Sequence, residues 1–183
     1  MKRIIVIGSP GAGKSTFSRE LSRRLGLPLY HLDSLYWKPG WVERSSEEWA
    51  AIHEGVLAQP TWVVDGNYGS TLHLRVAAAD TVIWLDLPRT LCLYRCLKRV
   101  VRHWGRTRPD MGAGCPERLD IDFLKYVWRF KRNGRAKIFT CLLKYGDDKV
   151  VYRLSARRRI RKFLDQVSEE SGGDARTNAA SSD

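Results

Sequence analysis

The chain has 183 residues, of which 43% are hydrophobic and 28% charged, a composition typical of a single soluble globular domain. Its apolar runs are far shorter than the roughly 20 residues that a membrane-spanning helix needs, and the run before Gly8 is too short for a secretory signal; we therefore expect a cytoplasmic protein without a membrane partner. The formal net charge of +12 favours polyanionic partners, either nucleotide phosphates or nucleic acid.

The N-terminal segment begins an alternation of strands and helices. Residues 3–7 form an apolar run that stops at a glycine, which predicts a short buried parallel strand. Residues 14–25 carry apolar side chains at four-residue spacing before Gly26, which predicts a helix with a glycine C-cap. Residues 29–32 predict a second strand, and the Trp- and Pro-containing segment 33–44 predicts a loop.

The middle of the chain continues the alternation. Ser45 or Ser46 can cap a helix that ends at Leu57, because glutamates follow in its first turn and favour the positive end of the helix dipole. The next expected elements are a strand at 62–64, a short helix at 72–79 and a strand at 81–85.

The C-terminal half is strongly basic, with 22 Lys or Arg against 6 Asp or Glu over residues 88–162. The expected elements are a helix at 89–104, a mobile Gly- and Pro-containing loop at 105–116, a helix at 117–145, a strand at 149–152 and a helix at 156–167. Residues 168–183 are mostly small and polar, which predicts a disordered tail. We therefore expect one domain over residues 1–167.

Strands that alternate with helices predict an α/β fold of three layers, in which helices cover both faces of a parallel sheet. The four cysteines form no CxxC pair and no zinc-finger spacing with histidine, so a metal site at these residues is not expected. Cys92 and Cys96 lie four residues apart on one expected helix face, which indicates small buried thiols in a reducing compartment.

A phosphate-binding motif lies between the first strand and the first helix. Its spacing G-x-x-x-x-G-K-[ST] is complete, and a strand before it and a helix after it favour a phosphate-binding loop over a glycine-rich turn. The glycines let successive N–H groups point at phosphate oxygens, and the helix adds its positive end. We expect ATP to bind here, with Lys14 at the β- and γ-phosphates, Ser15 on Mg²⁺ and Thr16 at the α-phosphate. The motif residues are Gly8, Ser9, Pro10, Gly11, Ala12, Gly13, Lys14, Ser15 and Thr16.

Three acidic residues follow expected strands, where open α/β sheets bind their ligands. Asp33 can orient a substrate hydroxyl or a Mg²⁺-bound water, and the alternative is a loop cap. Asp65 can act in the Mg²⁺ site or contact the substrate, again with a loop cap as the alternative. Asp86 precedes Leu87-Pro88 and is better placed to cap the next helix.

Arginines gather on the helix 89–104 and on the loop beyond it. Arg95 and Arg99 share one helix face, and Arg106 and Arg108 lie in the loop. Phosphoryl transfer depends on positioning and on neutralising charge at the moving group, which arginines of a closing loop can supply. The alternative for each arginine alone is a solvated surface position. The candidate catalytic residues are therefore Lys14, Asp33, Arg99, Arg106 and Arg108.

Aromatic residues cluster after the second expected strand. Tyr36, Trp37 and Trp41 can sandwich a base or another planar acceptor, or they can pack under the long loop. The four histidines show no pairing that indicates acid–base catalysis.

The motif, Asp65-Gly66-Asn67 and the arginines resemble adenylate kinase and its nucleoside-monophosphate-kinase relatives. The segments 31–41 and 105–110 are most similar to the branch known as DNA topology modulation proteins, which are FlaR-type P-loop proteins. Over residues 1–167, this resemblance implies a P-loop NTPase fold with a five-stranded parallel sheet of order 2-3-1-4-5, an acceptor-binding region and a mobile helical lid at about 105–118.

The resemblance is incomplete at the acceptor. In adenylate kinases an arginine follows the Asp-Gly of the third strand and grips the acceptor phosphate, whereas this chain has Asn67-Tyr68-Gly69 after Asp65-Gly66. Arg75 on the next helix is a candidate replacement. Arg118 and Arg129 resemble the paired lid arginines of that family.

Two functions compete. The leading hypothesis is an enzyme, a kinase-like phosphotransferase that moves the γ-phosphoryl group of ATP to a small acceptor, with ATP and Mg²⁺ as cofactors. The alternative is a nucleic-acid-associated, ATP-binding regulator with little or no turnover. No helix-turn-helix, RNA-binding or zinc pattern is present in the sequence, so we expect only non-specific binding to nucleic acid.

Overall fold

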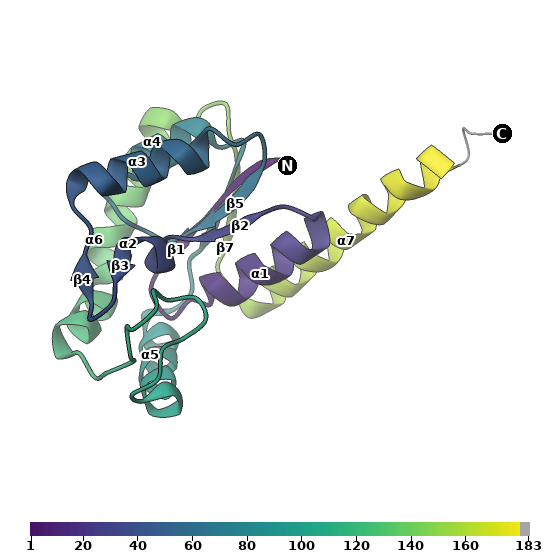
Figure 1. The fold of residues 1–183 in the computed structure, drawn as a ribbon. Coiled ribbons are helices and arrows are strands. Elements are labelled where there is room, and N and C mark those ends of the chain that lie inside the picture. Colours follow the sequence, from purple (N-terminus) through teal and green to yellow (C-terminus); the bar gives the residue numbers. More distant parts are fainter. Residues whose placement is uncertain (180–183) are drawn as a thin grey trace.

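The computed structural model describes residues 1–179, with the side chains of residues 1–168. A five-stranded sheet forms its centre (Figure 1). The strands of this sheet are β1 (Arg3–Gly8), β2 (Leu29–His31), β5 (Trp62–Asp65), β6 (Thr81–Leu85) and β7 (Val150–Leu154). The helices are α1 (Lys14–Leu25), α2 (Leu32–Tyr36), α3 (Ser46–Leu57), α4 (Leu72–Ala78), α5 (Arg89–His103), α6 (Ile121–Tyr145) and α7 (Arg157–Ala179).

All neighbouring strands of the central sheet are parallel, in the order β2-β5-β1-β6-β7. The labels differ from the expected 2-3-1-4-5 because the chain also forms a short antiparallel hairpin, β3 (Trp37–Lys38) with β4 (Val42–Glu43), which we did not predict. Without the hairpin, the five central strands follow the expected order. The three-layer α/β fold class is confirmed.

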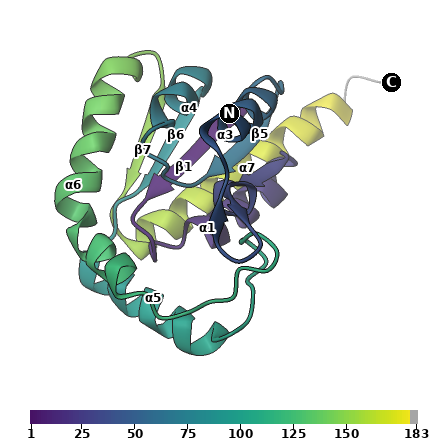
Figure 2. The same ribbon diagram turned by 60° about the vertical axis from the view of Figure 1, so that its left-hand side comes forward.

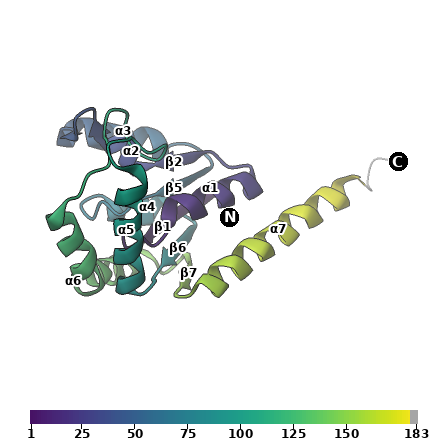
Figure 3. The same cartoon turned by 90° about the horizontal axis from the view of Figure 1, so that it is seen from below.

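Side chains of β1 alternate between the two faces of the sheet, as a strand requires. Ile4 and Val6 join a core cluster with α1, α5 and α7, whereas Ile5 and Ile7 join a second cluster with α3, α4 and α6. Figure 2 shows α6 and α7 on opposite sides of the sheet. Figure 3 shows α7 running away from the body of the molecule at its far end.

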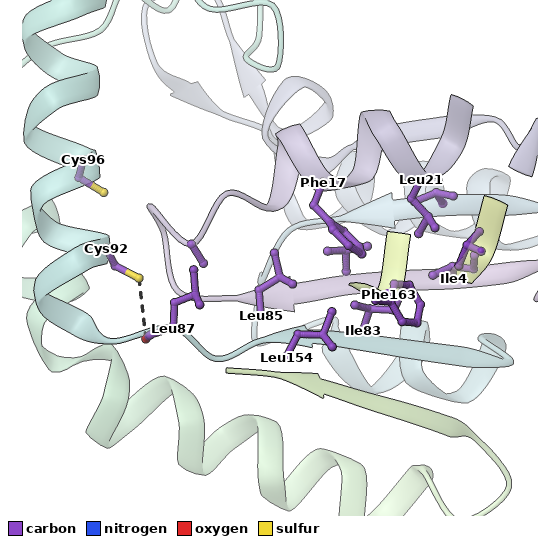
Figure 4. Packing of buried hydrophobic residues seen from close by; sticks show 14 of the residues in the cluster. Ile4, Phe17, Leu21, Ile83, Leu85, Leu87, Cys92, Cys96, Leu154 and Phe163 are labelled. Carbon is purple, nitrogen blue, oxygen red and sulfur yellow. Dashed lines mark hydrogen bonds between the residues drawn. The ribbon is translucent and has the colours of Figure 1, made fainter. Parts of the chain in front are cut away.

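Helix α5 packs across the end of the sheet through its cysteines. Cys92 and Cys96 are fully buried and point toward the body of the protein, where Leu87 and Leu85 lie beneath them (Figure 4). The Cys92 thiol lies 3.9 Å from the Leu87 carbonyl oxygen. All four cysteines are free thiols, and three of them are buried, in agreement with the small-thiol interpretation.

Most element boundaries lie close to the expectation. Of the two predicted caps of α3, Ser45 is the one used: its hydroxyl accepts from the Glu48 N–H at 3.2 Å, and the Glu48 carboxylate accepts from the Ser45 N–H at 2.9 Å. The segment expected as a loop at 33–44 contains α2 and the hairpin. Helix α6 begins at Ile121 instead of residue 117, because the Asp120 side chain caps it by accepting from the Phe123 N–H.

Helix α7 continues to Ala179, past residue 167 where we expected it to end. The tail at 168–183, which we expected to be disordered, lies largely outside the described side chains and in part outside the described backbone, so its disorder stays a prediction. Among residues 1–179, no helix is both long and apolar enough to cross a membrane.

Candidate functional site

The P-loop curls between β1 and α1 because glycine occupies its tightest positions. Gly11 has φ +77°, and a Cβ there would overlap the Cys92 carbonyl of α5. Gly8 has φ +143°, and a Cβ there would overlap the Leu85 carbonyl of β6. Both the left-handed backbone and the close approach exclude other residues, so the loop is held tightly against two neighbouring elements.

Lys14 lies at the centre of this loop. Its ammonium donates to the Gly8 carbonyl at 2.9 Å and to the Ser9 carbonyl at 3.2 Å. Burial lowers the pKa of Lys14, and the carboxylates of Asp33 and Asp65 oppose that shift. Lys14, which the motif predicts at the phosphates, therefore interacts electrostatically with two acidic side chains from separate elements.

Arg95 holds the P-loop from the side of α5. Its guanidinium donates to the Ala12 carbonyl at 3.1 Å. Burial and the positive charge of Arg157 on α7 lower the pKa of Arg95. The sequence placed Arg95 beside Arg99 but not in the catalytic set; only the packing of α5 on the P-loop identifies it as a site residue.

Asp33 is placed by α2, two residues beyond the end of β2. Its carboxylate accepts from the Tyr68 hydroxyl at 2.9 Å. Burial raises the pKa of Asp33, and the Lys14 ammonium opposes the rise. The carboxylate thus lies in a low-dielectric environment between a cation and a phenol, the kind of environment that tunes a carboxylate toward proton transfer.

Asp65 ends β5 and is almost fully buried at 4% exposure. One carboxylate oxygen lies 2.8 Å from His31 Nδ1, and the other has no hydrogen-bond partner among the described residues. Burial alone would lower the pKa of His31, but the bond to Asp65 outweighs it and the pKa is raised. Sequence reasoning missed this pairing, because the residues are 34 apart in sequence and no local signal could reveal it.

A Mg²⁺ site fits these residues in part. The free Asp65 oxygen is a buried acceptor that lacks a donor, and the Ser15 hydroxyl lines the same cavity. Within the described part of the chain, no group of three or more His, Cys, Asp or Glu could hold a metal ion alone. That agrees with the way Mg²⁺ is held in nucleotide sites, by few protein ligands together with phosphate oxygens and water.

The lid segment between α5 and α6 is tied together by Glu117. Its carboxylate lies 3.0 Å from the guanidinium of Arg99 and 2.7 Å from that of Arg108. Arg108 also pairs with Asp110 at 2.8 Å. The structure therefore brings Arg99 and Arg108 together as we expected, and adds two acidic partners that sequence reasoning missed.

Arg106 does not join this group. Its side chain is exposed, does not line the cavity described below and makes no hydrogen bond or ion pair with any described residue. Its backbone instead pairs with Glu117 and His103. The expectation that Arg106 works beside Arg108 is not supported by this placement, because Arg106 lies in the bend directly after α5, where its N–H donates to the His103 carbonyl and its side chain stays exposed.

Arg75 also differs from the expectation. It is fully buried and donates to the carbonyls of Gly66, Asn67 and Tyr68. Burial lowers the pKa of Arg75 to about 10. It does not line the cavity, so it shapes the loop after β5 and does not replace the missing acceptor arginine.

The site residues surround one cavity of about 1490 Å³. Cavities that hold one drug-sized ligand are usually about 300–1,000 Å³, so this volume suffices for a nucleotide and an acceptor together. Trp37, Trp41 and Arg118 line the cavity, with the Arg118 guanidinium 5.7 Å from the Trp41 ring centre. Tyr36 and Arg129 lie outside its lining.

The hairpin and the lid form a joint roof over the cavity. The Gly40 N–H donates to the Gly114 carbonyl at 2.9 Å, and Trp41 Nε1 donates to the Pro116 carbonyl at 3.0 Å. In Figure 1 the segment after α5 rises toward α2 and β3. Tyr36 packs behind this roof, with its ring centre 4.8 Å from that of Tyr68, which supports packing rather than ligand contact for Tyr36.

Comparisons with known proteins agree with this geometry. A family model described as an AAA domain matches residues 4–103, more than half of the chain. A cytidylate kinase from Pyrobaculum aerophilum is 27% identical over 137 residues, which cover 68% of this chain and 72% of that protein. A shikimate kinase from Corynebacterium glutamicum is 29% identical over 126 residues, which cover 62% of this chain and 71% of that protein.

Among solved structures, a shikimate kinase from Acinetobacter baumannii in complex with shikimate superposes with a TM-score of 0.57 at 14% sequence identity. The match covers 95% of this chain and 94% of that chain, and at such identity it concerns the fold. These matches do not single out the FlaR-type branch, so that part of the resemblance stays a prediction.

Proposed function

The chain belongs to the AAA domain family of P-loop proteins, and on that basis we propose that it transfers the γ-phosphoryl group of ATP to a hydroxyl group of a small acceptor. One observation carries the proposal most directly: the P-loop lysine Lys14 and the buried carboxylate of Asp33 interact across one cavity that is large enough for two ligands. The kinases that the chain is similar to support the same reaction class.

The P-loop residues Gly8 to Thr16 would hold the phosphates through their backbone N–H groups and through Lys14. Ser15 and Asp65 would hold Mg²⁺, Asp65 through the oxygen that has no other partner. When bound, the ion neutralises charge on the β- and γ-phosphates. The His31 ring fixes the other Asp65 oxygen at 2.8 Å, so the free oxygen has one orientation.

Asp33 would accept the proton of the acceptor hydroxyl. Its raised pKa makes it a better proton acceptor than an exposed aspartate, and the Tyr68 hydroxyl at 2.9 Å fixes its orientation. Arg99 and Arg108 would neutralise charge on the transferring group when residues 105–118 close as a lid. Glu117 positions both arginines before the nucleotide arrives.

The acceptor would occupy the half of the cavity lined by Trp37, Trp41 and Tyr68. Nucleoside monophosphates and hydroxylated metabolites are the two classes to test, because the proteins that this chain resembles include a cytidylate kinase and a shikimate kinase. Arg118 at the Trp41 ring is a cation available to an acidic group of the acceptor; Arg75 is not.

Two measurements test the proposal. Calorimetric titration should show that ATP binds the wild-type protein and that Lys14→Ala weakens binding about ten- to a hundredfold, because a charge-assisted contact is typically worth about 1.5–3 kcal/mol. Lys131→Ala, which removes one charge from an exposed position on α6, is the matched control and should bind ATP normally. A screen for acceptor-dependent ADP release then identifies the acceptor. Unchanged ATP affinity in Lys14→Ala would falsify the assignment of the site.

A further inference from the structure

The proposed mechanism assigns no role to Asp110, an acidic residue of the lid. Asp110 lies within a tight turn over residues 108–111, in which the Met111 N–H donates to the Arg108 carbonyl at 3.1 Å. The turn carries the Asp110 side chain inward, where only 10% of it is exposed, and it lines the same cavity as Lys14 and Ser15. An acidic side chain is not expected on a lid whose task is to neutralise phosphate charge.

The contacts of Asp110 point to the P-loop. Its carboxylate accepts from the Arg108 guanidinium at 2.8 Å, and it lines the same cavity as Ser15 of the P-loop. Burial alone would raise the pKa of Asp110, but Arg108 outweighs it and the pKa is lowered. Arg108 thus offsets the cost of burying this carboxylate in the cavity that also holds Ser15, the P-loop side chain proposed for the metal.

A second, independent observation concerns Asp65, the partner of His31. The Asp65 side chain is 94% buried, and one of its oxygens has no partner among residues 1–168. Asp65 and Asp110 line the same cavity, and the charge of each raises the pKa of His31. One carboxylate comes from the sheet and the other from the lid.

We propose that Asp110 belongs to the Mg²⁺ site, where it acts beside Ser15 on the hydration shell of the ion. Mg²⁺ gives up its water reluctantly and usually keeps several water molecules, and carboxylates outside the ligand shell orient such waters. The consequence is specific: the Mg²⁺–ATP complex, rather than ATP alone, holds the lid closed. This inference rests on the proposed function, because it presupposes that ATP occupies the P-loop.

The test compares binding of a non-hydrolysable ATP analogue with and without Mg²⁺, so it needs no acceptor and no turnover. Calorimetric titrations are run in excess Mg²⁺ and in EDTA, and the ratio of the two affinities is the gain from Mg²⁺. We expect Asp110→Asn to reduce this gain about 10- to 100-fold, the usual cost of losing a partner outside the ligand shell of a metal. Binding in EDTA should stay equal or become tighter, because a negative charge near the phosphates is removed.

The experiment also includes a matched control and a conservative variant of Asp110. Asp122→Asn removes a carboxylate that is 89% exposed on α6 and pairs with Lys125, and it should leave both affinities unchanged. Asp110→Glu keeps the charge opposite Arg108 but moves its oxygens outward, so it should bind the analogue in EDTA like the wild type while its Mg²⁺ gain changes by about tenfold. This variant also tests the proposal if Asp110→Asn does not fold.

The outcomes separate this inference from the proposed function. If the wild-type protein does not bind the analogue under either condition, the proposed function fails, and this inference with it. If the wild type binds but shows no gain from Mg²⁺, or if Asp110→Asn keeps the wild-type gain, the inference alone is overturned. An equal loss of affinity in Mg²⁺ and in EDTA also overturns it, because Asp110 would then serve only as the structural partner of Arg108.

Discussion

Arg108 and Arg106 lie two residues apart in one lid, and the structure predicts opposite outcomes when each is replaced by alanine. The Arg108 side chain is 10% exposed and pairs with Asp110 at 2.8 Å and Glu117 at 2.7 Å. Arg106 is exposed and makes no side-chain hydrogen bond or ion pair with the described residues. Arg106→Ala is therefore a matched control that removes the same charge from the same segment.

The magnitudes follow from these contacts. Arg108→Ala should lower kcat about a hundredfold, the scale of one lost donor to a transition-state charge, while the Kd for ATP changes less than about tenfold. It should also destabilise the fold by about 3 kcal/mol, the lower end for breaking a buried ion pair, because Glu117 keeps Arg99 as a partner. Arg106→Ala should change kcat less than about threefold and stability by less than about 0.5 kcal/mol, as is usual for surface positions.

Three measurements on the same preparations decide the question: steady-state ADP release with the identified acceptor, calorimetric titration of ATP, and urea unfolding. Equal losses of kcat in the two variants would refute the reasoning, because they would mean that Arg106 enters the cavity when the lid closes. Loss of ATP binding in Arg108→Ala without loss of turnover by the remaining bound ATP would place Arg108 in the resting nucleotide site instead.

Three further predictions concern Asp33, Arg75 and nucleic acid. Burial raises the pKa of Asp33 above its ordinary 3.8, and only the ionised carboxylate accepts a proton. We therefore expect kcat to fall as the pH is lowered through that raised pKa, which a pH profile of kcat measures. Asp33→Asn should lose most of the turnover and the fall of kcat at low pH. Arg75→Met should lower the free energy of unfolding by about 3 kcal/mol or more in urea titrations, because it removes the donor of the Gly66 and Asn67 carbonyls. Duplex DNA should bind only weakly, at about 10⁻⁴–10⁻⁶ M, with a steep salt dependence and no preference for sequence; tight, sequence-selective binding in a salt-titrated assay would instead favour the regulator.

The lid illustrates how far a local pattern reaches. The Gly- and Pro-containing segment and the nearby arginines predicted a lid over the P-loop, and Arg99 and Arg108 line the same cavity as the P-loop residues. The pattern could not distinguish Arg106 from Arg108, because both are arginines of one Gly- and Pro-containing segment. The choice depends on Glu117 and on the hairpin that the lid contacts, and neither partner is adjacent in sequence.

The loop after β5 is a second example of what the local sequence could not predict. Arg75 was a reasonable candidate for an acceptor contact because it follows Asp65-Gly66 on the next helix. In the structure its guanidinium turns inward and donates to the backbone carbonyls of Gly66 and Asn67. A buried carbonyl needs a hydrogen-bond donor. Which carbonyls are buried, and therefore need one, is known only from the folded loop.

The sequence by itself determined the P-loop, the alternation of strands and helices, and therefore the three-layer fold and the class of ligand. These features depend on residues that are neighbours in the chain: the motif spans eight consecutive positions, and each strand or helix shows its own periodicity. Only the tertiary structure decided that His31 pairs with Asp65, that Arg95 holds the P-loop and that Asp110 lines the same cavity as Ser15. Each of these arrangements joins residues from separate elements. Burial strengthens the electrostatic interactions of these residues, and it arises only when the elements pack together.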